Sequence, residues 1–180
     1  MVKEIKKRFA IHHLNQWIRN NKHQRRITTF AEVKSIGIIY DATEPDTDTE
    51  IKRLTKKLGA MGKEIYTLGF VNKKALPANI MPHTKEDYFC KGDLHWYELP
   101  IKDRISRFAN EQFDYLLNIY STDSMPMMGV SALSKAQCRL GTFHLKFTGC
   151  YDFMLSETQP MSPAELLDAF ILYLYKLKND

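Results

Sequence analysis

Acidic side chains follow several strands that the sequence predicts. Asp41, Glu44 and Asp46 come after the first predicted strand, Asp123 after the central strand and Glu157 after the last. If two or three of these carboxylates meet at one edge of a sheet, they could hold Mg²⁺, the usual arrangement for phosphate chemistry. Acidic residues are also common in loops and are favourable near helix N-termini, and we prefer this structural interpretation. The sequence therefore predicts no metal site.

Two polar loops could bind a small ligand. Thr43 stands near Asp41, where the DxD motif of haloacid-dehalogenase-like phosphatases would have its second Asp, so that motif is incomplete. Ser121, Asp123 and Ser124 precede a predicted helix, where hydroxyls and backbone N–H groups could receive an anion. The same residues are typical of a helix cap, which is our preferred interpretation. The sequence contains neither GxGxxG nor a P-loop, and it identifies no cofactor.

Cysteine and histidine chemistry has weak support. The three cysteines, Cys90, Cys138 and Cys150, are scattered and form no CxxC pair. The six histidines never pair at i,i+4 and do not complete a zinc site. A nucleophilic Cys–His pair stays open, but we expect reduced, buried thiols.

The positive charge is concentrated at the N-terminus. Residues 1–33 carry eight basic and two acidic side chains, a net charge of +6, whereas the rest of the chain has a net charge of −1. This basic arm is a solvated helix packed on the body, or it contacts anionic lipid or nucleic acid. We divide the chain into the arm, residues 1–33, and a single α/β domain, residues 34–180.

Length and composition indicate one folded domain. The chain has 180 residues, of which 44% are hydrophobic and 26% charged. The sequence shows no secretory h-region and no segment near the roughly 20 apolar residues that span a bilayer. We expect a cytoplasmic location.

Hydrophobic periodicity predicts alternating strands and helices. The strands are expected at 36–40, 63–71, 88–90, 113–120, 137–141 and 151–155, and the helices at 2–22, 48–61, 101–108, 126–134 and 163–178. Thr47 and Glu50 form a predicted capping box, and Gly62 a predicted C′ glycine. The pattern predicts a three-layer, Rossmann-like α/β fold with a mostly parallel sheet.

The last two strands are expected to be antiparallel. The segment between them, 142–150, is too short for a crossover helix. The helix Pro163–Lys178, opened by a capping box of Ser162 and Glu165, is apolar on two stripes. We expect one stripe to face the sheet and the other to face the N-terminal helix or a second subunit, which predicts a possible homodimer.

Three segments carry a resemblance to known proteins. FDYLLNIYS at 113–121, SKAQCRLG at 134–141 and YDFMLSE at 151–157 resemble a bacterial family of short, uncharacterised α/β proteins, a domain of unknown function. The first two are also similar to the acceptor half of heptosyltransferase-like glycosyltransferases, with Arg139 and Gly141 at an R-x-G strand end. That second similarity implies glycosyl chemistry, although such enzymes carry a second Rossmann domain for which this chain has no room.

These observations favour an α/β binding or interaction module without catalysis. The alternative is an enzyme of phosphate or glycosyl chemistry with its site at the carboxyl ends of the strands. The candidate ligand-binding residues are Asp41, Thr43, Ser121, Asp123, Arg139 and Glu157.

Overall fold

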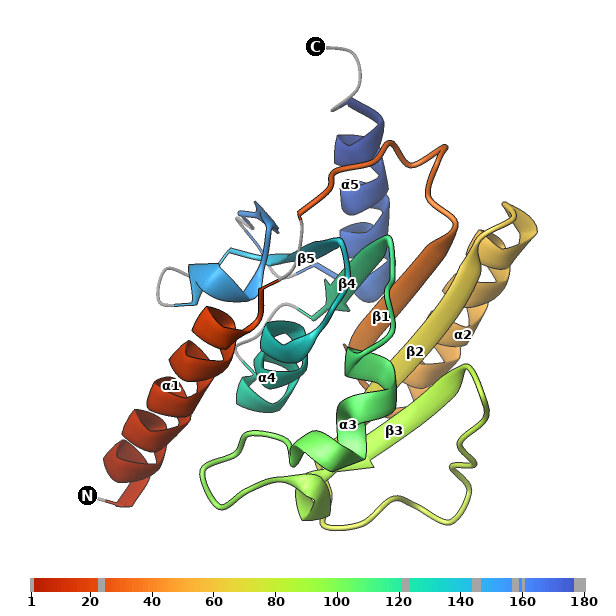
Figure 1. The fold of residues 1–180 in the computed structure, drawn as a ribbon. Coiled ribbons are helices and arrows are strands. Elements are labelled where there is room, and N and C mark those ends of the chain that lie inside the picture. The colour runs from red at the N-terminus through yellow and green to blue at the C-terminus, as the bar shows by residue number, and fades with distance from the viewer. Residues whose placement is uncertain are drawn as a thin grey trace.

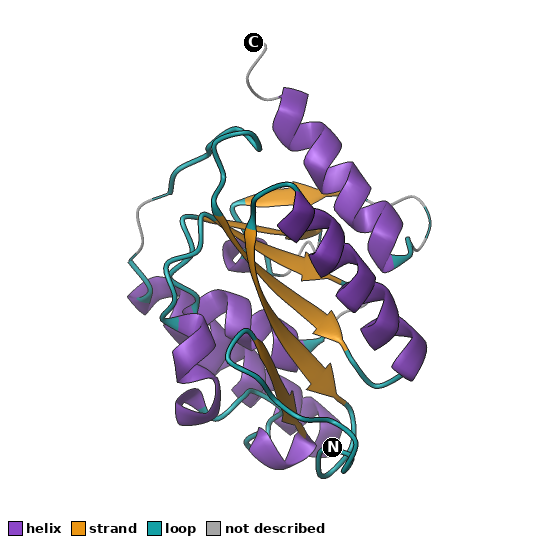
Figure 2. Cartoon of the chain, turned by 90° about the vertical axis from the view of Figure 1, so that its right-hand side faces the viewer, coloured by secondary structure: helices purple, strands orange, loops and turns teal. Residues whose placement is uncertain are grey.

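The computed structural model has one parallel sheet between layers of helices (Figures 1 and 2). It describes residues 2–22, 25–120, 124–143, 147–156, 159 and 161–176. Within these residues the sheet has six strands in the order β3-β2-β1-β4-β5-β6. The strands are β1 Ser35–Asp41, β2 Glu64–Val71, β3 Glu86–Cys90, β4 Tyr115–Ile119, β5 Cys138–Thr142 and β6 Phe153–Leu155. The predicted Rossmann-like α/β class is confirmed.

Continuous apolar runs explain the two central strands. β1 and β4 lie side by side in the middle of the sheet, and every residue of β4 is buried. Strands that helices cover on both faces need apolar residues on both faces. β2, whose two faces differ in bulk, lies next to the edge strand β3, near the edge as expected.

Helices cover both faces of the sheet. α2 Pro45–Ala60 and α5 Pro163–Lys176 pack on one face, and α3 Lys102–Ala109 and α4 Met125–Leu133 pack on the other. α1 Val2–Asn20 lies outside α4 and packs on it through Ala10, Leu14 and Trp17. Of the two partners predicted for the second stripe of α5, the N-terminal helix is wrong, because α1 lies on the other side of the sheet, and a second subunit stays a prediction.

The expected antiparallel last pair is also wrong. β5 and β6 are parallel, with Leu140 opposite Phe153 and Thr142 opposite Leu155. The connection contains a single 3₁₀ turn, η2 Thr148–Cys150, and no α-helix among its described residues. A short connection is enough to bring the chain back to a parallel start, because β6 has only three residues. The backbone N–H of Asp152, just before β6, donates to the carbonyl of Arg139 in β5 at 2.7 Å.

Helix ends agree with the sequence in two places and differ in one. Gly62 follows the end of α2 with φ of 77°, as a C′ glycine should. Ser162 and Glu165 form the reciprocal hydrogen bonds of a capping box. The predicted box at Thr47 is wrong, since α2 begins at Pro45, whose ring presets the φ of a first-turn residue.

Candidate functional site

The chain reverses its direction of winding between β1 and β4. β1 leads into α2 on one face of the sheet, whereas β4 leads into α4 on the other face. Parallel neighbours that diverge in this way leave a crevice beyond their carboxyl ends, where α/β proteins bind ligands. Tyr40 pairs with Ile119 in the register of the two strands. Asp41, the last residue of β1, therefore lies at the carboxyl end of a central strand beside β4.

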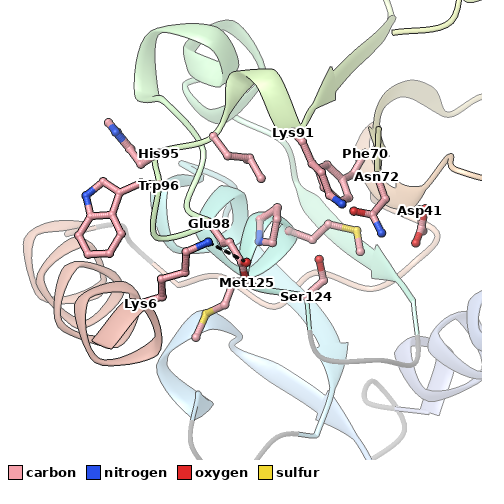
Figure 3. Close-up of a pocket in the computed structure, with 13 residues that line it drawn as sticks. Lys6, Asp41, Phe70, Asn72, Lys91, His95, Trp96, Glu98, Ser124 and Met125 are labelled. Carbon is pink, nitrogen blue, oxygen red and sulfur yellow. Dashed lines mark ion pairs between the residues drawn. The ribbon is translucent and has the colours of Figure 1, made fainter. Parts of the chain in front are cut away.

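A cavity of about 630 Å³ occupies this crevice (Figure 3). Its lining comes from α1, from the ends of β1 and β2, from the loop after β3 and from the start of α4. The lining residues are Lys6, Asp41, Phe70, Asn72, Lys91, Leu94, His95, Trp96, Glu98, Ser124, Met125, Pro126 and Met127. The volume lies in the range of about 300–1,000 Å³ that small-molecule sites occupy.

Asp41 lines the cavity, whereas Thr43 shapes the loop behind it. The backbone N–H of Thr43 donates to Asp41 Oδ1 at 2.9 Å, and the Thr43 hydroxyl accepts from the N–H of Asn72 at 3.0 Å. The N–H of Ala42 donates to the carbonyl of Phe70 at 2.8 Å. These bonds tie the ends of β1 and β2 together, so Thr43 has a structural role and Asp41 a position at the site.

The start of α4 forms another wall of the cavity. Ser124 occupies the N-cap position and lines the cavity, but its side chain makes no capping hydrogen bond. The sequence predicted that this cluster caps the helix. Ser124 does occupy the cap position, but its hydroxyl does not make the capping hydrogen bond. Ser121, Asp123 and Glu157, three of the predicted site residues, lie outside the described residues.

The loop after β3 supplies residues that sequence reasoning missed. Lys91, His95, Trp96 and Glu98 all line the cavity from the segment 91–100. Figure 3 places Lys91, Asn72 and Asp41 at one end of the cavity and Trp96, Glu98 and Lys6 at the other. A signal was available in the sequence, because the run KGDLHWY at 91–97 directly follows the predicted strand 88–90 and puts cationic and aromatic side chains at the carboxyl edge of the sheet.

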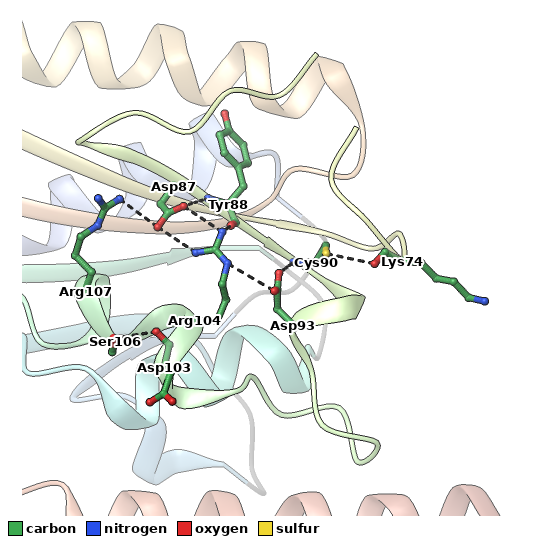
Figure 4. A network of polar contacts seen from close by, with 9 residues as sticks. All are labelled: Lys74, Asp87, Tyr88, Cys90, Asp93, Asp103, Arg104, Ser106 and Arg107. Carbon is green, nitrogen blue, oxygen red and sulfur yellow. Dashed lines mark hydrogen bonds and ion pairs between the residues drawn. The ribbon is translucent and has the colours of Figure 1, made fainter. Parts of the chain in front are cut away.

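A network of charges holds this loop in place (Figure 4). Arg104 of α3 pairs with Asp87 at 3.3 Å and with Asp93 at 3.6 Å, and it also donates to the carbonyl of Tyr88. Asp93 belongs to the 3₁₀ turn η1, Lys91–Asp93, and accepts from the N–H of Cys90 at 2.8 Å. The network therefore fixes both ends of the turn that carries Lys91 into the cavity.

Glu98 has an unusual backbone at the cavity wall. Its φ is 71°, in the left-handed region that residues other than glycine rarely adopt. The backbone N–H of Glu98 donates to the carbonyl of His95 at 2.9 Å, and its carboxylate lies 4.0 Å from Lys6 Nζ. Both side chains of this ion pair are exposed by more than a third, so the pair contributes little to stability. Strained residues of this kind cluster at ligand sites.

Arg139 does not belong to the cavity. It is 3% exposed, and its guanidinium forms a two-pronged ion pair with Asp152 at 3.0 and 3.1 Å. A third bond runs from Arg139 Nη1 to the carbonyl of Ser131 at 3.3 Å. The prediction of Arg139 as a ligand-binding residue is therefore wrong, because its donors are used inside the fold.

The cysteines are free and buried, as predicted. Burial raises the pKa of the Cys138 thiol and of the Cys150 thiol to about 12 each, which keeps both protonated and unreactive at neutral pH. Burial also raises the pKa of Cys90, whose Sγ lies 3.5 Å from the carbonyl oxygen of Lys74. A nucleophilic role is unsupported for these thiols.

The described residues contain neither a metal-binding cluster nor a helix that could cross a membrane. No group of three or more His, Cys, Asp or Glu side chains in that part of the chain is arranged to hold a metal ion. Within the same residues, no helix has both the length and the apolar composition that crossing a bilayer requires.

Comparison with known proteins gives a family and no activity. No curated protein and no solved structure matches the chain. The similarity to heptosyltransferase-like glycosyltransferases and the bacterial source therefore stay predictions. Residues 6–177 match the family of unknown function DUF6913, and the chain belongs to that family.

Proposed function

We infer that this protein is a binding domain that takes a small, polar, anionic ligand in the cavity between the ends of β1 and β4. The cavity itself carries the proposal. It has the volume of a metabolite site, it lies at the switch point of the sheet, and charged side chains from three separate segments line it.

The lining suggests the chemistry of the ligand. Lys6, Lys91 and His95 offer cationic or N–H donors to an anionic group such as phosphate. Asp41 and the amide of Asn72 offer acceptors to hydroxyl groups. Trp96 and Phe70 add flat apolar surface, which suits a planar or sugar ring. A phosphorylated sugar or a nucleotide combines these three features.

Thermal stabilisation of the full chain tests the proposal. Nucleoside phosphates and sugar phosphates would be compared with the matching uncharged nucleosides and sugars. A ligand at about 100 times its Kd stabilises the native state by about 2.7 kcal/mol, which raises the melting temperature measurably. We expect a rise with phosphorylated compounds and none with their uncharged counterparts.

Two cavity variants and one control locate the site. Lys91→Gln and Asp41→Asn should each weaken binding about tenfold or more, since each replaces a charged hydrogen-bonding group by a neutral one. Lys73→Gln changes an exposed lysine near the end of β2 that does not line the cavity, and it should bind as the native chain does. If the ligand still raises the melting temperature of both cavity variants as it does that of the native chain, the ligand binds at a site other than this cavity.

Catalysis by the same residues is the alternative, and product analysis separates it from binding. The ligand identified by stabilisation would be incubated with the chain and with Asp41→Asn, and the mixture examined by mass spectrometry. Conversion that depends on Asp41 would make the protein an enzyme of phosphate or glycosyl chemistry. A ligand recovered unchanged supports the binding domain.

A further inference from the structure

Helix α1 has a second apolar stripe that the fold does not use. Ala10, Leu14 and Trp17 face inward and pack on α4 and η2. Val2, Ile5 and Phe9 follow one another at spacings of three and four residues, so they share a different face of the helix. These side chains are 70%, 45% and 46% exposed. The outward stripe is therefore apolar surface in contact with water.

Trp96 extends the outward stripe from another part of the chain. Its side chain is 54% exposed, and its ring centroid lies 5.1 Å from that of Phe9. Trp96 comes from the loop after β3, which the Arg104 network holds in place. Ile5, Arg8, Phe9 and His12 line a pocket of about 310 Å³ beside the stripe. The apolar patch is thus preformed from two segments and does not depend on α1 alone.

Exposed arginines lie beside this patch, whereas Lys3 and Lys7 lie on the side of the helix that carries Ala10 and Leu14. Residues 2–22 carry six basic side chains and one acidic side chain. Lys3, Lys7, Arg8 and Arg19 are all exposed. Arg8 and Arg19 lie on the side of the helix next to Ile5, and α1 forms an outer flank of the molecule in Figure 1. A surface that meets this flank must accept apolar side chains and supply negative charge beside them.

We propose that this flank, made of Val2, Ile5, Phe9 and Trp96 with Arg8 and Arg19 beside them, docks on an anionic lipid bilayer. An amphipathic helix lies in the plane of a bilayer interface with its apolar side chains among the upper acyl chains and its basic side chains at the headgroups. Phe and Trp are well suited to that boundary. Nucleic acid offers phosphates to the basic side chains but no apolar layer for Val2, Ile5 and Phe9. A bilayer offers both, and it therefore fits the apolar stripe as well as the basic side chains.

Vesicle sedimentation with the full chain tests the docking. Vesicles of phosphatidylcholine alone would be compared with vesicles that also contain phosphatidylserine, at low and at high salt. We expect binding to the anionic vesicles, weaker at high salt. The double variant Ile5→Ser, Phe9→Ser should reduce binding about tenfold or more. Arg8→Gln should reduce it about fivefold, whereas Lys7→Gln, on the other side of the helix from the stripe, should reduce it less.

The controls separate a lost surface from a lost fold. Met81→Ser removes an equally apolar side chain, 70% exposed, from the loop between β2 and β3, and it should bind as the native chain does. A melting curve of each variant establishes that it folds. Phosphatidylcholine with brominated acyl chains should quench the fluorescence of Trp96 in anionic vesicles. This quenching should disappear in Trp96→Phe, because the remaining Trp17 is buried.

Three results would overturn the proposal. The first is the absence of binding to anionic vesicles at low salt. The second is vesicle binding that the serine variants leave unchanged, which would exclude the apolar stripe. The third is tighter binding to single-stranded or duplex DNA at the same salt, unaffected by the serine variants, which would make the flank a nucleic-acid surface instead.

Discussion

The hydroxyl of Tyr40 donates a 2.6 Å hydrogen bond to the carboxylate of Asp48. Tyr88 donates to the same carboxylate oxygen at 2.9 Å, and Lys52 Nζ lies 3.0 Å from the other oxygen. Tyr40 belongs to β1, Tyr88 to β3 and Asp48 to α2, so one carboxylate links two strands to the helix that covers them. Burial alone would raise the pKa of Asp48, but the hydrogen bonds from Tyr40, Lys52 and Tyr88 outweigh it and lower that pKa.

This link predicts a loss of stability in acid. A carboxylate with a lowered pKa in the folded state stabilises the protein fully above its unfolded pKa of about 3.9, and the stabilisation is lost as the pH falls through the lower folded value. Asp48→Asn should cost about 1–3 kcal/mol of unfolding free energy at pH 7. Urea denaturation should show the native chain and the variant converging below about pH 4. Asp46→Asn, at an exposed position in the same helical turn, should cost less than about 1 kcal/mol.

Two arginines share the carboxylate of Asp152 and should differ in their effect on stability. Arg139 and Asp152 have side chains that are 3% exposed each, whereas the Arg25 side chain is 64% exposed. Arg139→Met leaves a buried carboxylate without its main partner and should cost about 3–5 kcal/mol. Arg25→Ala removes an exposed guanidinium 2.7 Å from the same carboxylate, which keeps its buried partner Arg139, and should therefore cost less, about 1 kcal/mol. Equal losses in urea denaturation would contradict the structural role given to Arg139.

Two glycines should respond in opposite directions to alanine. A Cβ at Gly141 would lie 2.5 Å from the ring of Tyr151, which is buried, whereas a Cβ at Gly59 would meet nothing within 4 Å. Gly141→Ala should therefore destabilise the protein by about 1–3 kcal/mol. Gly59→Ala, near the end of α2, should stabilise it by up to about 1 kcal/mol. Thermal melts of the two variants check the signs, and a stable Gly141→Ala protein would mean that Tyr151 can move aside.

Substitutions on the outer surface of α5 test the predicted homodimer. Leu172 is 53% exposed, whereas Ile171 packs against the core. Ile171→Asp should destabilise the monomer. Leu172→Asp should leave the melting temperature unchanged and lower the mass measured by sedimentation if copies associate through this helix. A native chain that sediments as a monomer at all concentrations would remove the dimer from consideration.

Local patterns predicted most of the fold because they depend on neighbours in sequence. The apolar run in 36–40 and the helical spacing of Ile51, Leu54 and Leu58 are each complete within one element. The direction of β6 is not local, since it depends on how a ten-residue connection turns back across the end of β5. The start of α2 was misjudged because Pro45, whose ring presets the φ of a first-turn residue, begins the helix before the predicted box.

The candidate site was less predictable than the fold. Asp41 could be identified because it follows a strand that the sequence already marked as central. For Lys91 and Trp96 the sequence offered only their place after a predicted strand, because their loop has no periodic pattern and its position is set by Arg104 of α3. Arg139 was misassigned for the opposite reason: its sequence context is that of a strand end, but its partner Asp152 comes from a later segment.

The attachment of α1 also determines the order in which a newly made chain can fold. The side-chain amide of Asn21, at the end of α1, donates to the carbonyls of Ala132 and Ser134, and the bond to Ala132 spans 111 residues of sequence. At the usual rate of translation the helix leaves the ribosome on the order of ten seconds before the surface that receives it. During this interval Leu14 and Trp17 are exposed together with Phe9 on the outward stripe, so the nascent chain presents a more apolar helix than the finished protein does.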